Sequence, residues 1–302
     1  MSSNNNLLFG AIEAGGTKII CAILDQNAKI LKESSILTTT PEETSKQIFS
    51  FFSSYKISSL GIGTFGPIDL HPQSPTFGSI LNTPKLPWKN FNYIKSFSSL
   101  GIPISIDTDV NAACLGEATF GSSKGLENVV YITIGTGIGI GVISEGKLLH
   151  GMMHPEGGHM LISKNDKDDF ESVCPYHINC FEGLASGPSI QKRWGKEANE
   201  LKNDEKVWEL EADYIAQDLV NIILMLQPQR IILGGGVMHQ EQLFPLIRQK
   251  VISKINNYLI TKELENMEEY IVPCSLNDKQ GILGSFKIGF DKYHEEINKK
   301  NK

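Results

Sequence analysis

The chain lacks the features that mark secreted, membrane-spanning or nucleic-acid-binding proteins. No apolar run reaches the roughly 20 residues that a membrane-spanning helix needs. Residues 1–6 carry neither the basic nor the apolar region of a secretory signal. The net charge of −6 offers no basic surface to nucleic acid. We therefore expect a cytoplasmic protein with no nucleic-acid partner and no membrane contact.

Cysteine is also scarce, and the count of five is odd. Cys21, Cys114 and Cys274 lie in apolar surroundings that are typical of small core residues. In a reducing compartment the other two, Cys174 and Cys180, are better metal ligands than disulfide partners.

These two cysteines belong to a four-ligand set with His159 and His177. Three of the four lie within seven residues, a spacing that one loop can wrap around a tetrahedral ion. A closed set predicts structural Zn²⁺, because catalytic zinc keeps an open position. The alternative is a pair of loop cysteines beside unrelated surface histidines.

Two carboxylates, Glu156 and Glu182, flank these ligands. A bound ion would hold both of them rigidly toward a polyol substrate. The alternative is that they are ordinary surface glutamates.

The order of expected elements suggests a duplication within the 302 residues, of which 40% are apolar. Each half begins with a strand–turn–strand unit and continues with alternating helices and strands. This pattern predicts two α/β lobes around a cleft. Strands are expected over 7–12, 19–24, 30–37, 59–63, 102–106, 129–134 and 230–233, with a returning strand that ends at 143; helices are expected over 41–55 and 213–226, and a long loop over 64–101.

Glycine-rich turns lie at equivalent places in the two halves, one over 13–18 and the other over 135–141. Neither fits a P-loop or a dinucleotide-binding turn, because a strand follows each of them. Taken singly, each turn fits a plain β-hairpin turn better than a phosphate-binding one. As a pair they favour two turns whose backbone N–H groups bind phosphate oxygens.

A third glycine run, Gly234–Gly236, follows the strand over 230–233 and is expected to open a helix. Glycines there let a flat ring or a phosphate approach the strand end. The alternative, close packing of helix on strand, needs only one glycine.

Asp109 follows the strand that ends at 106. Phosphorylation of a sugar hydroxyl needs a base, and an aspartate at a strand end suits that role. Asp109 could equally be the N-cap of a helix over 110–120, and the local sequence alone favours the cap.

Together these motifs resemble the ROK family (repressors, open reading frames and sugar kinases) over nearly the whole chain, most of all its bacterial fructokinases. The resemblance implies a duplicated actin-like (ribonuclease-H-like) ATPase fold of the α/β class, with two lobes around a central cleft. It divides the chain into a small lobe over 1–112 and a large lobe over 113–285. The zinc loop over 154–182 belongs to the large lobe, and a C-terminal helix over about 286–302 packs back on the small one.

The resemblance also implies roles for individual residues. Asp109 matches the catalytic base, which overrides the preference for a cap. The expected sugar contacts are Asn82, Asn111, Glu156, His159 and Glu182, so that His159 also serves the metal. The expected nucleotide contacts are Gly15, Gly16, Thr17, Lys18, Gly135, Thr136, Gly137, Gly187, Pro188, Gly234, Gly235, Gly236, Val237 and Met238.

The chain departs from the family pattern at two places. Many members have aspartate where this chain has Glu13, a position that the resemblance associates with Mg²⁺. Many also carry Cys-x-Cys-x4-Cys, whereas here His177 stands between two cysteines. Both departures look like the fructokinase branch.

We predict an ATP-dependent hexose kinase that converts D-fructose to fructose 6-phosphate, with ATP, Mg²⁺ and structural Zn²⁺, and with a homodimer implied by the family. One alternative is a ROK kinase for mannose, glucose or an N-acetylated hexosamine. Another is a non-catalytic sugar-binding regulator, which needs a DNA-binding helix-turn-helix. Only about a dozen residues precede Glu13, too few for one.

Overall fold

The computed structural model describes residues 7–301, so residues 1–6, in which no signal was expected, lie outside the described part. The chain forms two compact units. Unit 1 comprises the residues up to 125, with 150–154 and those from 275 onward, and unit 2 comprises 126–149 and 155–274. The division therefore differs from the expected boundaries after 112 and 285.

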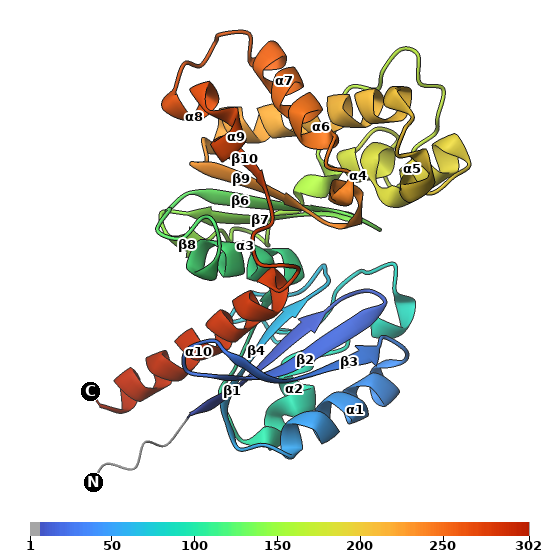
Figure 1. Ribbon diagram of the computed structural model, residues 1–302. Helices are drawn as coiled ribbons and strands as arrows, with labels where there is room; N and C mark the ends of the chain where they lie inside the picture. The colour runs from blue at the N-terminus through green and yellow to red at the C-terminus, as the bar shows by residue number, and fades with distance from the viewer. Residues whose placement is uncertain (1–6, 302) are drawn as a thin grey trace. The chain divides into compact units, whose positions relative to one another are not determined.

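Unit 1 is built on a five-stranded mixed sheet (Figure 1). β1 pairs antiparallel with β2 and parallel with β4, where Ile12 lies opposite Ile62. Both faces of β1 are buried, because Phe9 and Ala11 enter one apolar cluster while Ile12 and Ala14 enter another. This double burial explains the nearly continuous apolar run. The strands, in order across the sheet, are β3 (Ile30–Leu37), β2 (Lys18–Asp25), β1 (Leu8–Ala14), β4 (Ile57–Thr64) and β5 (Ile104–Thr108).

The segment over 64–101, expected as a loop, folds against one face of this sheet. It contains the short helices η1 (Leu86–Trp88), α2 (Tyr93–Phe97) and η2 (Ser98–Leu100). Trp88, Tyr93 and Phe97 are buried in the same cluster as Phe52 of α1 (Pro41–Ser53). Helices this short leave no clear periodicity, which is why the sequence did not reveal them.

The other face of the sheet is covered by α3 (Asp109–Phe120) and α10 (Gln280–Lys300), which Figure 1 shows side by side. Their backbones approach closely: a Cβ on Gly284 would lie 1.6 Å from the Ala112 carbonyl oxygen. α10 also begins earlier than the expected 286. Contacts of α10 with α3 and β4 assign both helices to unit 1.

Unit 2 repeats the plan of unit 1. Its hairpin β6–β7 is antiparallel, and β9 runs parallel to β6, as β4 runs parallel to β1. The sheet order is β10 (Ile271–Pro273), β9 (Arg230–Gly234), β6 (Val129–Ile134), β7 (Ile138–Ser144) and β8 (Lys147–Leu148). The duplication inferred from the sequence is confirmed.

Helices α6 (Glu205–Leu226) and α7 (Leu243–Ile255) lie over one face of the unit 2 sheet (Figure 1). α6 begins eight residues before the expected 213, because Asp204 caps it and Val207 and Trp208 are buried. The remaining helices of this unit are η3 (Gly157–His159), α4 (Phe181–Ala185), α5 (Gly187–Trp194), η4 (Ala198–Leu201), η5 (Gly236–His239), α8 (Lys262–Glu265) and α9 (Met267–Tyr270). No helix within residues 7–301 is long and apolar enough to cross a bilayer.

Candidate functional site

The first glycine turn joins β1 to β2 in unit 1. The Gly15 N–H donates to the Lys18 carbonyl at 3.0 Å, and the Thr38 hydroxyl donates to the Gly15 carbonyl at 2.9 Å. Among the described residues, no carbonyl or side chain accepts the N–H groups of Gly16 and Thr17. The turn therefore offers two adjacent donors to an anion.

Asp109 is the first residue of α3 and is not its N-cap. β5 continues to Thr108, two residues beyond the expected end, and the Thr108 hydroxyl accepts the Asn111 N–H at 3.1 Å. The cap favoured by the local sequence is therefore wrong. One Asp109 carboxylate oxygen instead accepts the Val110 N–H at 2.9 Å.

The environment of Asp109 adjusts its acidity. Burial raises the pKa of Asp109 to about 6, and the hydrogen bond from Val110 opposes this rise. A carboxyl group that titrates close to neutral pH is well matched to accepting a proton from a substrate hydroxyl.

Glu13 lies near the end of β1, next to the first glycine turn. Burial, and after it the negative charge of Asp109, raise the pKa of Glu13 to about 7, whereas Lys18 acts in the opposite direction. The Glu13 carboxyl packs on α10, where a Cβ on Gly281 would lie 2.4 Å from it. Because the negative charge of Asp109 disfavours the ionised form of Glu13, a nearby cation would stabilise Glu13 as a carboxylate.

Asp107 lies on β5 close to Asp109, and no role was predicted for it from the sequence. One oxygen of its buried carboxylate accepts the Asn111 side-chain N–H at 2.7 Å and the Thr108 N–H at 2.8 Å. The other oxygen lies 2.8 Å from His150 Nε2. Asn111, an expected sugar contact, is fully buried and is oriented by this carboxylate. An acidic residue at a strand end was the available signal for Asp107, whereas nothing local indicated His150.

Asn82, the other expected sugar contact in unit 1, is exposed. Its side-chain carbonyl accepts a hydrogen bond from the Lys89 ammonium at 3.3 Å.

The second glycine turn joins β6 to β7 in unit 2 and resembles the first. The Gly135 N–H donates to the Gly137 carbonyl at 2.9 Å. Within the part of the chain that the structure describes, the Thr136 and Gly137 N–H groups have no intramolecular acceptor. This turn too presents two free donors.

The structure brings the other predicted nucleotide segments of unit 2 against this turn. The Gly187 N–H donates to the Gly135 carbonyl at 2.7 Å. Gly235, at φ +88°, comes so close to Ile134 that a Cβ would lie 2.5 Å from the Ile134 oxygen. Val237 and Met238 follow as buried residues, and Pro188 lies in the first turn of α5.

The helix that follows Gly234–Gly236 differs from the expected one. η5 is a single 3₁₀ turn, and the next α-helix, α7, begins only at Leu243. The glycines therefore permit close backbone approach, but they do not open an α-helix with its dipole.

The four predicted metal ligands come together in unit 2. One ligand atom from each of His159, Cys174, His177 and Cys180 lies within 4.8 Å of the other three. The sulfur of Cys174 lies 3.9 Å from His159 Nδ1 and 3.5 Å from His177 Nδ1, and the sulfur of Cys180 lies 3.7 Å from His159 Nδ1. Sulfur and nitrogen ligands of a tetrahedral Zn²⁺, bonded at about 2.3 Å and about 2.0 Å, are about 3.5 Å apart. The four side chains thus have the spacing that the ion needs.

The backbone around these ligands is closely fitted to them. The sulfur of Cys180 accepts the Gly183 N–H at 3.3 Å, at the start of α4. A Cβ on Gly183 would lie 2.9 Å from the Cys174 Cβ. Burial, followed by the neighbouring Cys174, raises the pKa of Cys180 to about 12. A thiolate at this position therefore requires a cation beside it.

Glu156 and His159 flank two glycines that pack on β7. A Cβ on Gly158 would lie 1.9 Å from the Ile138 carbonyl oxygen, and a Cβ on Gly157 would lie 2.5 Å from the Ile140 side chain. Glycine at both positions thus lets η3 lie directly on the strand. Glu156 is exposed and His159 is half-buried.

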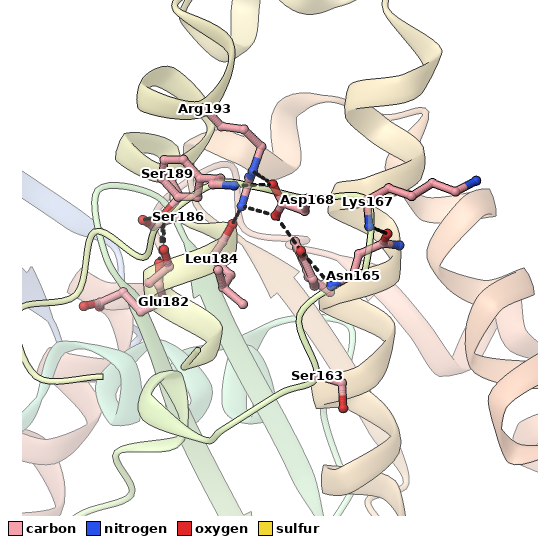
Figure 2. Close-up of polar contacts among 12 residues, drawn as sticks. Ser163, Asn165, Lys167, Asp168, Glu182, Leu184, Ser186, Ser189 and Arg193 are labelled. Carbon is pink, nitrogen blue, oxygen red and sulfur yellow. Dashed lines mark hydrogen bonds and ion pairs between the residues drawn. The ribbon is translucent and has the colours of Figure 1, made fainter. Parts of the chain in front are cut away.

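Glu182 connects the metal-ligand region to the second glycine turn. Its carboxylate accepts the Ile138 N–H at 2.9 Å, and its backbone carbonyl accepts the Ser189 hydroxyl at 3.1 Å (Figure 2). Glu182 is thereby fixed from both α5 and β7. The five expected sugar contacts are divided between the units, with Asn82 and Asn111 in unit 1 and the other three in unit 2.

Comparison with known proteins identifies the family. A fructokinase of Pediococcus pentosaceus is 44% identical over 283 residues, which cover 93% of this chain and 97% of that protein. A fructokinase of Zymomonas mobilis is 42% identical over 295 residues, which cover 94% of this chain and 97% of that one. The fold matches the crystal structure of a ROK hexokinase from Thermus thermophilus with a TM-score of 0.79 at 22% identity, over 96% of this chain and 100% of the other. Since the sequence model of the ROK family matches residues 9–291, this protein belongs to the ROK family.

Proposed function

We propose that this protein transfers the γ-phosphoryl group of ATP to the primary hydroxyl of D-fructose and forms fructose 6-phosphate. The observation that carries the proposal is the identity of 42–44% to proteins named fructokinase, over more than nine-tenths of each chain. The geometry of the two glycine turns and of Asp109 supplies a matching chemistry.

Asp109 is proposed as the general base. As the hydroxyl oxygen of the sugar attacks the γ-phosphorus in line, Asp109 accepts the hydroxyl proton, and ADP leaves. The pKa of about 6 keeps most Asp109 carboxylates ionised at neutral pH while leaving them more basic than an exposed aspartate. The hydrogen bond from Val110 fixes the direction of one carboxylate oxygen.

The two glycine turns are proposed to bind the phosphates of ATP, since each offers two adjacent N–H donors. Gly187, Pro188 and the segment from Gly234 to Met238 are proposed to line the adenosine pocket. The hydrogen bond of Gly187 with Gly135 of the second turn, and the close approach of Gly235 to Ile134 at the end of β6, support this assignment, because they gather these segments at one end of the unit 2 sheet.

Glu13 is the proposed carboxylate for Mg²⁺, which when bound would neutralise charge on the transferring phosphoryl group. Magnesium in such sites takes one or two carboxylates and several oxygens from phosphate and water. The raised pKa of Glu13, with the negative charge of Asp109 as a cause, supports a cation near this residue.

His159, Cys174, His177 and Cys180 are proposed to hold a structural Zn²⁺ in a Cys2His2 set. The distances between their ligand atoms support a tetrahedral ion. Nδ1 of His159 faces both sulfur atoms. With Nδ1 on the metal, the neutral ring carries its proton on Nε2, and that N–H is then a donor to a sugar hydroxyl.

The remaining proposed sugar contacts are Glu156 and Glu182 in unit 2, and Asn82 and Asn111 in unit 1. Carboxylates accept hydrogen bonds from sugar hydroxyls, and amides both accept and donate. The proposal therefore predicts that substitution of any one of these four residues weakens fructose affinity.

A coupled assay of ADP release over a panel of sugars tests the function. Fructose is expected among the best substrates, and turnover is expected to require Mg²⁺. If the protein prefers mannose, glucose or an N-acetylated hexosamine, the kinase activity is confirmed and the proposed sugar is wrong. Absence of ADP release with every sugar, together with a duplex-DNA mobility shift at physiological salt, would favour the regulator instead.

The homodimer and the cytoplasmic location stay predictions of the sequence. Light scattering on purified protein tests the dimer.

A further inference from the structure

A buried ion pair joins Arg193 to Asp168 in unit 2. Their side chains are only 5% and 4% exposed. The Arg193 Nε donates to one Asp168 oxygen at 3.2 Å, and Nη2 lies 3.2 Å from the other, so the pair is two-pronged (Figure 2). The Tyr214 hydroxyl donates to the same carboxylate at 2.6 Å. A buried charge is costly without its partner, so the Arg193 guanidinium and the Asp168 carboxylate stabilise the fold only when they are in contact.

The pair ties three separate segments together. Asp168 lies in the loop over 163–180, which carries Cys174, His177 and Cys180 and has no helix or strand of its own. Arg193 lies in α5 and also donates through Nη2 to the Leu184 carbonyl of α4 at 2.8 Å. Its guanidinium stacks on the Phe170 ring at 4.3 Å.

These contacts act on both ends of the ligand-bearing loop. Asp168 and Phe170 precede Cys174, whereas α4 begins after Cys180 and carries Glu182. The Val173 N–H donates to the Gly183 carbonyl at 3.0 Å, so that the loop is also hydrogen-bonded to α4. One guanidinium therefore holds the start of the loop and the helix at its end.

We propose that Arg193 is a positioning residue for the kinase reaction: through Asp168 and Leu184 it holds the loop and α4 so that Glu182 and the metal ligands keep the geometry that the sugar requires. The proposal rests on the function proposed above. Lysine cannot replace arginine here, because an ammonium group lacks the planar fork that reaches Asp168 and Leu184 together.

The test compares Arg193→Met and Arg193→Lys with Lys250→Met. Lys250 forms a more exposed ion pair with Glu209 in the same unit, so its variant controls for the loss of one cation. Each protein is assayed for kcat and for the KM of fructose and ATP. We expect Arg193→Met to raise the fructose KM about 10- to 100-fold, with the ATP KM changed less than about 3-fold. Arg193→Lys should give a smaller change in the same direction, and the control should match the wild type.

A second measurement does not depend on activity. Trypsin cleavage after the exposed Lys164 and Lys167 reports the order of the loop, and we expect it to be faster in both Arg193 variants than in the control. If cleavage is faster in the Arg193 variants but the wild type has no fructokinase activity, the role of Arg193 in holding the loop is confirmed and the proposed function is wrong. If Arg193→Met fails to fold, Arg193→Lys decides. Wild-type fructose KM and cleavage rate in a folded Arg193 variant would overturn the proposal.

Discussion

Replacing the proposed base should make this protein more stable as well as inactive. Asp109→Asn keeps an oxygen that accepts the Val110 N–H, and it removes the ionisable carboxyl. The pKa of Asp109 rises from an ordinary 3.8 to about 6 chiefly through burial. A carboxyl group with a raised pKa in the fold opposes folding once it is ionised, so its contribution to stability is lost as the pH rises through about 6.

The size of this effect follows from the two pKa values. Their difference of about 2.2 corresponds to about 3 kcal/mol at pH 8, where Asp109 is ionised in both the folded and the unfolded chain. At pH 4.5 the carboxyl is mostly protonated in the fold, and the same relation gives about 1 kcal/mol. The side-chain NH2 of asparagine needs a hydrogen-bond acceptor that the carboxylate did not need, and this offsets part of the gain in stability. We expect Asp109→Asn to be about 1–3 kcal/mol more stable at pH 8 and nearly unchanged at pH 4.5.

Thermal unfolding of ligand-free protein at the two pH values measures this difference, and coupled ADP release measures activity. kcat should fall about 10²- to 10⁴-fold in Asp109→Asn, and the wild-type kcat/KM should decline as the pH falls below about 6, where the base is protonated. Asp291→Asn on α10, which loses a partly exposed pair with Lys287, should change stability by less than about 0.5 kcal/mol. Equal or lower stability of Asp109→Asn at pH 8, or turnover within tenfold of the wild type, would refute the reasoning.

Three further changes test the rest of the site. Purified wild type is expected to contain about one zinc ion per chain, and serine at both Cys174 and Cys180 should remove it; equal metal content of the two proteins by elemental analysis contradicts the ligand set. Gly183→Ala should weaken zinc retention about tenfold, because its Cβ would lie 2.0 Å from the Ser172 hydroxyl oxygen and 2.9 Å from the Cys174 Cβ; a rate of zinc loss to a chelator equal to that of the wild type would contradict this crowding. Gly235→Ala should raise the ATP KM at least about tenfold, because its Cβ meets the Ile134 backbone, whereas Gly146→Ala, at a similarly positive φ but in open space, should not; equal values for the two would reject the nucleotide role.

Several parts of the fold and the site could be predicted from the sequence because they depend on neighbours along the chain. The first strand of each hairpin is a nearly continuous apolar run, and the turn that follows it is glycine-rich. Cys174, His177 and Cys180 lie within seven residues, so one loop gathers them whatever surrounds it. These features needed no knowledge of distant contacts.

Other features depended on residues far apart in the sequence. The N-cap of α3 is Thr108 and not Asp109, because β5 pairs with β4 as far as Thr108. The pairing of strands is decided by tertiary contacts. α3 and the start of α10 belong to unit 1 because their glycines pack on each other, which their composition did not reveal. His150 reaches Asp107 across 43 residues of chain.

Sequence by itself thus determined which side chains are present for the proposed chemistry: the proposed base, the two glycine turns and the four side chains of the proposed metal-ligand set. Tertiary structure alone decided their properties, because burial is produced by segments that are distant in the chain. It gives Asp109 a pKa of about 6, and it places Arg193 beside Asp168 and Leu184. Desolvation and bond geometry depend on the folded surroundings of a residue, and no local pattern encodes them.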